Sequence, residues 1–175
     1  MANEERIIIF IDGSNFYHCM KVEMGTAKLD FEALIRKLCG DRRLIRTYYY
    51  NAPADQETAP QDYEAQQKFF ARLKRIPYFE IKLGRLEKRP TGLVEKGVDL
   101  TIAVDMLQLA YRNVYDTAIL VSGDGDFSYV VQALKDLGKH VENAFLRTGH
   151  SRQLRDVSDR FIEIDREFLK DVFLP

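Results

Sequence analysis

The sequence contains few of the residues that build covalent cross-links or zinc sites. Among 175 residues there are two cysteines, Cys19 and Cys39, and three histidines, His18, His140 and His150. Two cysteines cannot form a multi-disulfide scaffold, and neither the cysteines nor the histidines have the spacing of metal ligands. So little cysteine is typical of a reducing compartment, and we therefore expect the protein to be cytoplasmic.

Long apolar runs are also missing. The first run, residues 7–11, holds five apolar residues, whereas a membrane-spanning helix needs about 20. Glutamates precede this run, so we expect neither a secretory signal peptide nor a membrane partner. The length and the composition, 46% hydrophobic and 30% charged, predict a single globular domain over residues 1–175. A homo-oligomer would need an exposed apolar patch, and the sequence leaves this partner open.

A third absence is an excess of positive charge. The chain has 26 basic and 27 acidic residues and a formal net charge of -1, which argues against a broad nucleic-acid-binding surface. Basic residues nevertheless cluster in three segments: Lys82, Arg85, Lys88, Arg89 and Lys96; Arg42, Arg43 and Arg46; Arg147, His150, Arg152 and Arg155. Phosphate backbones bind such clusters by counterion release. Any nucleic-acid binding should therefore be weak and local.

Short β-branched and aromatic runs alternate with longer segments of helical period. The strand-like runs are residues 6–11, 44–50, 78–83, 117–121 and 140–145, with 161–164 as a weaker sixth. Helical patterns cover residues 31–38, 63–73, 99–112 and 126–137. This alternation predicts an α/β fold in which helices cover both faces of a mainly parallel sheet.

Several details refine these elements. Asp30 is placed to cap the helix at 31–38, and Gly138 follows the helix at 126–137. In the helix at 99–112, one face gathers Leu100, Val104, Leu107 and Tyr111. Residues 85–97 contain one proline and two glycines among basic residues, and they predict a hairpin-like excursion from the sheet.

Four aspartates fall where the predicted strands and crossovers end. Asp12 closes the first strand, Asp124 and Asp126 follow the strand at 117–121, and Asp99 opens the longest helix. In open α/β sheets, functional groups gather at the carboxyl ends of the strands, so we expect these carboxylates to converge. Close carboxylates need a counter-charge to stay ionised. Oxygen ligands without histidine or cysteine select Mg²⁺ or Mn²⁺ over zinc, and such a cation can activate water for attack on a phosphate.

Neighbouring polar residues belong to the same candidate site. Asn15 and Ser14 would lie in the first turn of a helix beside Asp12, and Ser122 ends the strand before Asp124. Their amide and hydroxyl groups could hold a phosphate oxygen. Two of the polar residues also have a plain structural explanation: Ser14 could cap the first helix, and we expect Asp126 to cap the helix at 126–137. Asp105 lies on the same long helix and is either solvated or a supporting partner.

Three separate motifs resemble a known family. They are IDGSNFY at residues 11–17, EKGVDLTIAVDM at 95–106 and LVSGDGDFSYVV at 120–131. Together they are similar to the NYN domain family, specifically its LabA-like branch, and the resemblance extends from about residue 6 to residue 164. It implies a PIN-like nuclease fold, a three-layer α/β/α sandwich. It further implies an acidic metal site at Asp12, Asp99, Asp124 and Asp126, with Asn15 and Ser122 at the matching polar positions.

These observations support one leading hypothesis and two rivals. The first is a Mg²⁺- or Mn²⁺-dependent phosphodiesterase, an endoribonuclease with RNA as its partner, in which Lys96 contacts the substrate because it precedes Asp99 by three residues. The second is an RNA-binding or regulatory module whose metal site is structural or vestigial. The third, a phosphatase of the haloacid dehalogenase type, lacks its DxD motif, since Gly13 and Ser14 follow Asp12. Tyr48, Tyr49 and Tyr50 either stack bases or alternate between core and surface.

Overall fold

The computed structural model describes residues 4–174. Its strands are β1 (Arg6–Asp12), β2 (Arg43–Asn51), β3 (Phe79–Leu83), β4 (Arg85–Arg89), β5 (Gly92–Lys96), β6 (Thr117–Val121), β7 (His140–Phe145) and β8 (Arg160–Glu163). Its helices are α1 (Gly13–Met24), α2 (Phe31–Cys39), α3 (Pro60–Leu73), α4 (Val98–Tyr111), the short 3₁₀ helix η1 (Gly125–Phe127), α5 (Ser128–Asp136), α6 (Arg152–Val157) and α7 (Arg166–Leu169).

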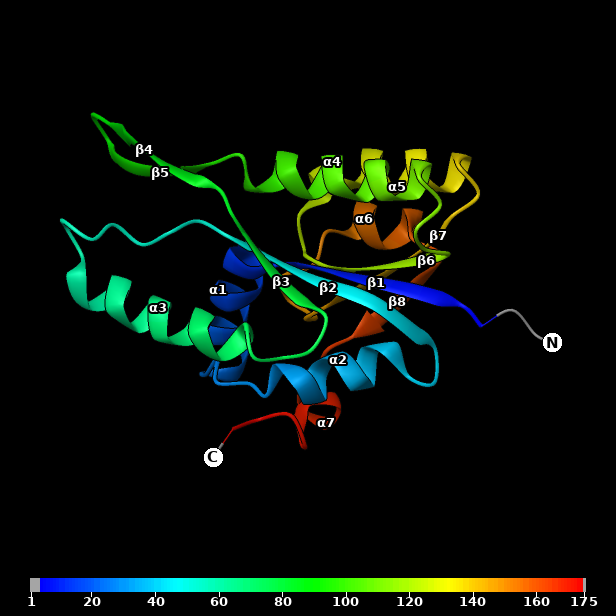
Figure 1. Ribbon diagram of the computed structural model, residues 1–175, viewed down its shortest axis with the longest axis horizontal. Coiled ribbons are helices and arrows are strands. Elements are labelled where there is room, and N and C mark those ends of the chain that lie inside the picture. The colour runs from blue at the N-terminus through cyan, green and yellow to red at the C-terminus, as the bar shows by residue number, and fades with distance from the viewer. Residues whose placement is uncertain (1–3, 175) are drawn as a thin grey trace.

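Six strands form one parallel sheet in the order β3-β2-β1-β6-β7-β8. The chain first builds the sheet outward from β1 through β2 to β3, then crosses back and builds outward on the other side from β6 to β8 (Figure 1). The strand order therefore reverses between β1 and β6. In open α/β sheets, such a reversal opens a crevice at the carboxyl ends of the two strands.

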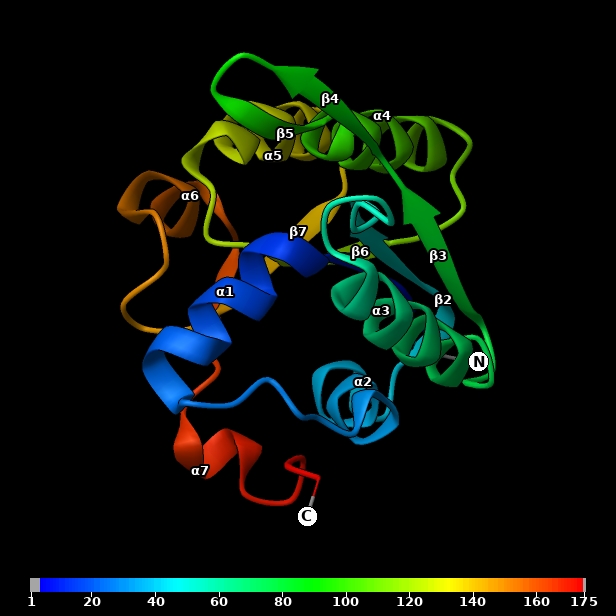
Figure 2. The ribbon, with the colours of Figure 1, turned by 90° about the vertical axis from the view of Figure 1, so that its left-hand side faces the viewer.

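The sheet separates two apolar layers. One core joins Ile7, Ile9 and Ile11 of β1 to α1, α2, α3 and α7, whereas the other joins Ile8 and Phe10 to α4, α5 and α6. The two helical layers lie on opposite sides of the sheet in Figure 1, and Figure 2 looks onto the end where α1, α2 and α3 meet. Because β1 is apolar at every position from 7 to 11, both of its faces are buried. The architecture is the expected three-layer α/β/α sandwich.

The predicted elements are confirmed, including the weaker sixth strand, which is β8. Residues 85–97 form an antiparallel pair, β4 and β5, which projects from the sheet toward the upper left of Figure 1. The helices α6 and α7 were not predicted, since they have only six and four residues and too little periodicity to detect. Asp30 caps α2 as expected, with its carboxylate accepting from the Ala33 amide at 3.0 Å.

The apolar face that the sequence pattern marks in α4 does not pack against the sheet. Val98, Ile102, Met106 and Ala110 are the buried residues of this helix, while the face with Leu100, Val104 and Tyr111 points outward. The exposed side chains of that face are Leu100 at 69%, Val104 at 51% and Tyr111 at 83%. Both faces of α4 are apolar, so periodicity alone could not tell which one meets the sheet.

Asp105 flanks the buried face of α4 and has a structural role. Its carboxylate accepts hydrogen bonds from Lys82 Nζ and from the Tyr50 hydroxyl, each at 2.7 Å. Tyr48, Tyr49 and Tyr50 are all buried, so they do not form an exposed base-stacking surface. Arg42 lies before β2, at the amino ends of the strands, where it pairs with Glu142 at 2.9 Å. The basic cluster around Arg42 is therefore remote from the sheet end that carries the aspartates.

Across residues 4–174, none of the helices has both the length and the apolar character required to cross a membrane.

Candidate metal centre

Asp12 is the last residue of β1 and the N-cap of α1. Its Oδ1 accepts a hydrogen bond from the Asn15 backbone amide at 3.2 Å, which satisfies one of the unpaired amides in the first helical turn. The side chain is only 3% exposed. The transition from a doubly buried strand to a capped helix thus fixes a carboxylate at the sheet end where the strand order reverses.

A hydrogen-bond network connects Asp12 to the loop after β6. The Ser122 hydroxyl donates to Asp12 Oδ2 at 3.1 Å and accepts from the Asp124 amide at 3.1 Å. Asn15 Oδ1 accepts from the Gly123 amide at 2.8 Å. Because these bonds join the two strands at the reversal, they hold Asp12 and Asp124 at one site even though 112 positions separate them in the sequence.

Asn143 supports the same loop from β7. It is fully buried, and its amide nitrogen donates to the carbonyl oxygens of Leu120 at 3.1 Å and Ser122 at 2.9 Å. Sequence reasoning missed this residue. The available signal was a lone asparagine inside the otherwise apolar second half of the strand HVENAF, because a buried amide must find hydrogen-bond partners.

Two glycines allow the strand-to-helix connections to approach closely. A Cβ atom on Gly123 would overlap the carbonyl oxygen of Gly149 and come within 2.5 Å of the Phe145 ring. A Cβ atom on Gly13 would overlap the Tyr49 ring. Only glycine fits at either position without a shift of the surrounding backbone or ring.

Asp99 and Asp126 join the site through their charges. Asp99 lies in the first turn of α4, and the charges of Asp124, Asp126 and Glu95 raise its pKa. The charges of Asp99 and Asp124 in turn raise the pKa of Asp12. All four predicted aspartates therefore lie in one region of negative potential, to which the structure adds Glu95 from β5.

The mutual repulsion is visible in the pKa values. Burial, followed by the charges of Asp99 and Asp124, raises the pKa of Asp12 from 3.8 to about 6, although the bonds from Asn15 and Ser122 oppose the rise. The pKa of Asp99 is also raised, first by burial and then by Asp124, Asp126 and Glu95. Carboxylates with raised pKa values at one place are typical of functional sites.

The donor set fits a hard divalent cation, although the ligands are not gathered around a single point. Among residues 4–174, no three histidine, cysteine or acidic side chains lie close enough together to form a ready-made ligand group. The carboxylates nonetheless share one electrostatic region and supply oxygen donors only. Asp99 in the first turn of α4 or Asp126 in η1 would have to move toward Asp12 and Asp124 to complete coordination.

The predicted cap of α5 was wrong. Asp126 does not cap α5, because it lies within η1, and its own amide donates to Asp124 Oδ1 at 2.9 Å. The capping alternative for Ser14 does not occur either, because Asp12 caps α1. In both places the turn begins one or two residues earlier than the sequence pattern indicated, and the Asp126 side chain is exposed to solvent.

The other predicted substrate contacts occupy different surroundings. The Ser14 hydroxyl donates to Asn51 Oδ1 at 2.7 Å and lies 3.2 Å from Glu95 Oε1, at the rim of the site. Ser122 is fully buried. Its hydroxyl already donates to the Asp12 carboxylate and accepts from the Asp124 amide. Lys96 ends β5, is half-buried, and makes no side-chain hydrogen bond or ion pair within the described part of the chain. Contact of these residues with substrate stays a prediction.

Known proteins with similar sequences or structures match most or part of this chain. The chain is 25% identical to the low amplitude and bright protein LabA of Synechococcus elongatus, over 97% of this chain and 90% of that protein. It is 34% identical over 74 residues to an uncharacterized protein of Methanocaldococcus jannaschii, which covers 42% of this chain and 31% of that one. A crystal structure of a Vibrio parahaemolyticus protein of unknown function superposes with a TM-score of 0.79 at 26% identity, covering 94% of this chain and 96% of that one.

The family assignment rests on a family model that matches most of the chain. The NYN domain model matches residues 6–165, which include β1, the loop after β6 and the beginning of α4, and therefore every aspartate of the site. This family is part of the PIN-like nuclease superfamily, whose members typically use divalent metals. The chain belongs to the NYN domain family.

Proposed function

We propose that the protein is a Mg²⁺- or Mn²⁺-dependent phosphodiesterase that cleaves RNA internally. The observation that carries the proposal is the network that joins Asp12 to Asp124 through Ser122, with Asp99 close enough to affect the charge of Asp12. Burial and, after it, the charges of neighbouring carboxylates disfavour the ionised forms of Asp12 and Asp99, and a bound divalent cation would offset both effects.

Each side chain then has a distinct task. Asp12 and Asp124 hold the cation from the two strands at the reversal, and Asp99 and Asp126 complete its coordination from the helix ends. A bound divalent cation lowers the pKa of the attacking water and neutralises charge on the phosphate. The side-chain nitrogen of Asn15, Nδ2, has no hydrogen-bond acceptor among residues 4–174. It is therefore available to donate to a phosphate oxygen.

One observation favours the second candidate function. The described residues lack a ready-made group of three metal ligands, which is what a regulatory RNA-binding module with a vestigial site would show. The two functions differ in their products. A nuclease converts RNA into shorter fragments, whereas a binding module leaves the RNA intact.

Cleavage of a 5′-labelled RNA of mixed sequence tests the nuclease. We expect cleavage with Mn²⁺ or Mg²⁺ and none in EDTA. We expect Asp124→Asn to slow cleavage by about 10- to 100-fold, the usual loss when a group supporting a metal site is removed. Asp124 is half-exposed, so water can partly replace it. The matched control is Asp136→Asn on α5, which should cut at the wild-type rate. Intact RNA with wild-type protein and either metal would instead support the regulatory module.

A further inference from the structure

A cleft of about 950 Å³ opens beside the candidate metal centre, between α1, α2, α3 and the β4–β5 hairpin. We call it the α1–α3 cleft. Ser14, Asn51 and Glu95 line it at the end next to the aspartates, where the Ser14 hydroxyl bonds Asn51 and approaches Glu95. Figure 2 looks onto this side of the molecule. The volume of the cleft is at the upper end of the ~300–1,000 Å³ range of ligand-binding sites.

Charge is distributed unevenly along the cleft. The end beside the metal centre carries Glu95, which adds to the negative potential of the aspartates. Further along, Lys21 of α1, Lys28 after α1 and Arg72 near the end of α3 supply positive charge. A cation at the acidic end and phosphates at the basic end would together match a nucleic-acid strand.

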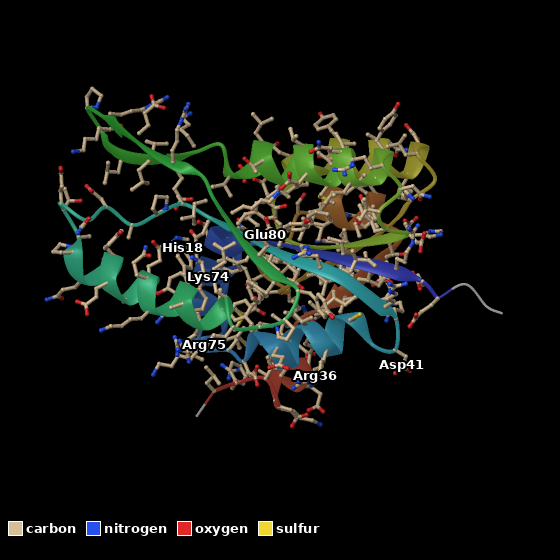
Figure 3. The ribbon with its side chains drawn as sticks, in the orientation of Figure 1. His18, Arg36, Asp41, Lys74, Arg75 and Glu80 are labelled. Carbon is tan, nitrogen blue, oxygen red and sulfur yellow. The ribbon has the colours of Figure 1, made fainter. Side chains whose placement is uncertain are left out.

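The basic end continues onto the surface of α3. A second depression, of about 560 Å³, shares Ala65 and Arg72 with the cleft and is also lined by Lys68 and Arg75. Figure 3 shows Arg75 beside Lys74 at the carboxyl end of α3, with His18 of α1 on the same side of the molecule. Lys68 is neutralised by Glu64 at 2.6 Å, so Arg72 and Arg75 are the main cations there.

Tyr17 places an aromatic ring in the cleft wall. It is 47% exposed, and Lys21 Nζ lies 5.8 Å from its ring centroid. His18 approaches the same ring edge-on at 5.6 Å. An exposed tyrosine flanked by a lysine can stack on a base while the lysine meets the adjacent phosphate. Across the cleft, Arg72 lies over the Phe69 ring at 6.0 Å, which orients its guanidinium group.

The acidic residues of the cleft do not remove this polarity. Asp30 caps α2 through the Ala33 amide, so the positive amino end of that helix partly offsets its negative charge. Asp62 lies in the first turn of α3, at the opposite end of that helix from Arg72. The basic end therefore keeps its positive charge where the cleft joins the second depression.

We infer that the α1–α3 cleft binds a single-stranded RNA segment adjacent to the scissile phosphate, with Tyr17 stacking on a base and Lys21 and Arg72 contacting phosphates. The inference rests on the proposed function, since it names where and in which form that substrate is held. A duplex would keep its bases stacked on one another, and Tyr17 could then make no stacking contact.

Fluorescence anisotropy in EDTA separates binding from cleavage. The probes are a 5′-labelled octauridylate and the same strand annealed to octaadenylate, at low salt and at a temperature that keeps the duplex formed. We expect the single strand to bind more tightly than the duplex. Tyr17→Ala should weaken single-strand binding about 10-fold, whereas Tyr17→Phe keeps the ring and should restore it. Arg72→Ala should lower the slope of log Kd against log salt by about 1.

Matched controls come from exposed residues outside the cleft. Tyr111→Ala removes a tyrosine that is 83% exposed on α4, and Arg112→Ala removes an exposed arginine at the carboxyl end of the same helix, outside the basic clusters. Both should bind the single strand like the wild type. Circular dichroism melts of all variants show whether any loss of binding comes from unfolding.

The outcomes separate this inference from the proposed function. Wild-type protein that binds octauridylate through Tyr17 but cuts no RNA keeps the cleft assignment and removes the nuclease. Protein that cuts RNA while Tyr17→Ala binds within twofold of wild type overturns the cleft assignment alone. Equal affinity for single strand and duplex, or no binding of octauridylate, also overturns it.

Discussion

Replacement of Asp12 by asparagine is expected to abolish RNA cleavage while making the metal-free protein more stable. Cleavage should fall by about 100- to 1,000-fold, the usual loss when a group that stabilises the reacting charge is removed. Asparagine has the same shape and can keep the bond to the Asn15 amide that caps α1. Loss of activity would therefore not come from loss of the fold.

The gain in stability follows from the pKa of Asp12. Burial and neighbouring carboxylates raise this pKa from 3.8 to about 6, which corresponds to a cost of about 3 kcal/mol for keeping the ionised group in the folded protein. Because the folded pKa is the higher one, the wild type is most stable below pH 4 with respect to this group. Its free energy of unfolding should then decline as the pH rises through about 6. The asparagine variant should not show this decline.

Urea unfolding in EDTA at pH 4 and pH 7 measures the effect. We expect Asp12→Asn to exceed the wild type by about 1–3 kcal/mol at pH 7 and by much less at pH 4. Asp165→Asn is the matched control, because Asp165 caps α7 through the Phe168 amide and lies away from the site. It should change neither stability nor cleavage. A destabilised Asp12→Asn protein at pH 7, or one that still cleaves RNA, would contradict both the repulsion and the role of Asp12.

Gly123→Ala is expected to damage stability and activity together. The added methyl group would overlap the Gly149 carbonyl oxygen and the Phe145 ring, so the loop after β6 must move. Overpacking of this kind costs about 1–3 kcal/mol, and the movement would also weaken the bond from the Gly123 amide to Asn15. Since the same loop carries Asp124, cleavage should fall about as far as in Asp124→Asn.

Gly25→Ala provides the comparison for that variant. Gly25 has a φ of 77°, and no atom lies within 4 Å of the added methyl group, so only backbone strain of about 1–2 kcal/mol is expected. Thermal unfolding and RNA cleavage should be measured for both proteins. If Gly123→Ala cuts RNA as well as Gly25→Ala does, the position of the loop after β6 is not essential for the chemistry.

The sequence predicted the centre of the sheet well because β1 and β6 are short apolar runs with both faces buried. Residues 7–11 are all apolar, so both faces of this strand must be buried. Gly13 after β1 and Gly123 and Gly125 after β6 mark the strand ends. The same strand ends placed Asp12 and Asp124 correctly at the carboxyl edge. What made this possible is that parallel strands must all end on one side of the sheet.

Contacts between segments that are distant in the sequence were harder to predict. Nothing near Glu95 in the sequence indicates that the β4–β5 hairpin brings it to Ser14, 81 positions earlier. The sequence also leaves open which face of α4 is buried, because the exposed face is equally apolar, with Leu100 and Tyr111 largely in solvent. Side-chain packing between segments decides both features, and local periodicity does not record it.

The location of Mn²⁺ in crystals of the wild-type protein tests the metal centre most directly. Anomalous scattering from crystals soaked in Mn²⁺ should give a peak bounded by carboxylate oxygens of Asp12 and Asp124, at about the 2.0–2.2 Å typical of small divalent cations, with Asp99 or Asp126 drawn toward it. Crystals of Asp12→Asn should give a weaker peak or none. Mn²⁺ bound elsewhere, with the four aspartates unoccupied at saturating metal, would contradict the assignment.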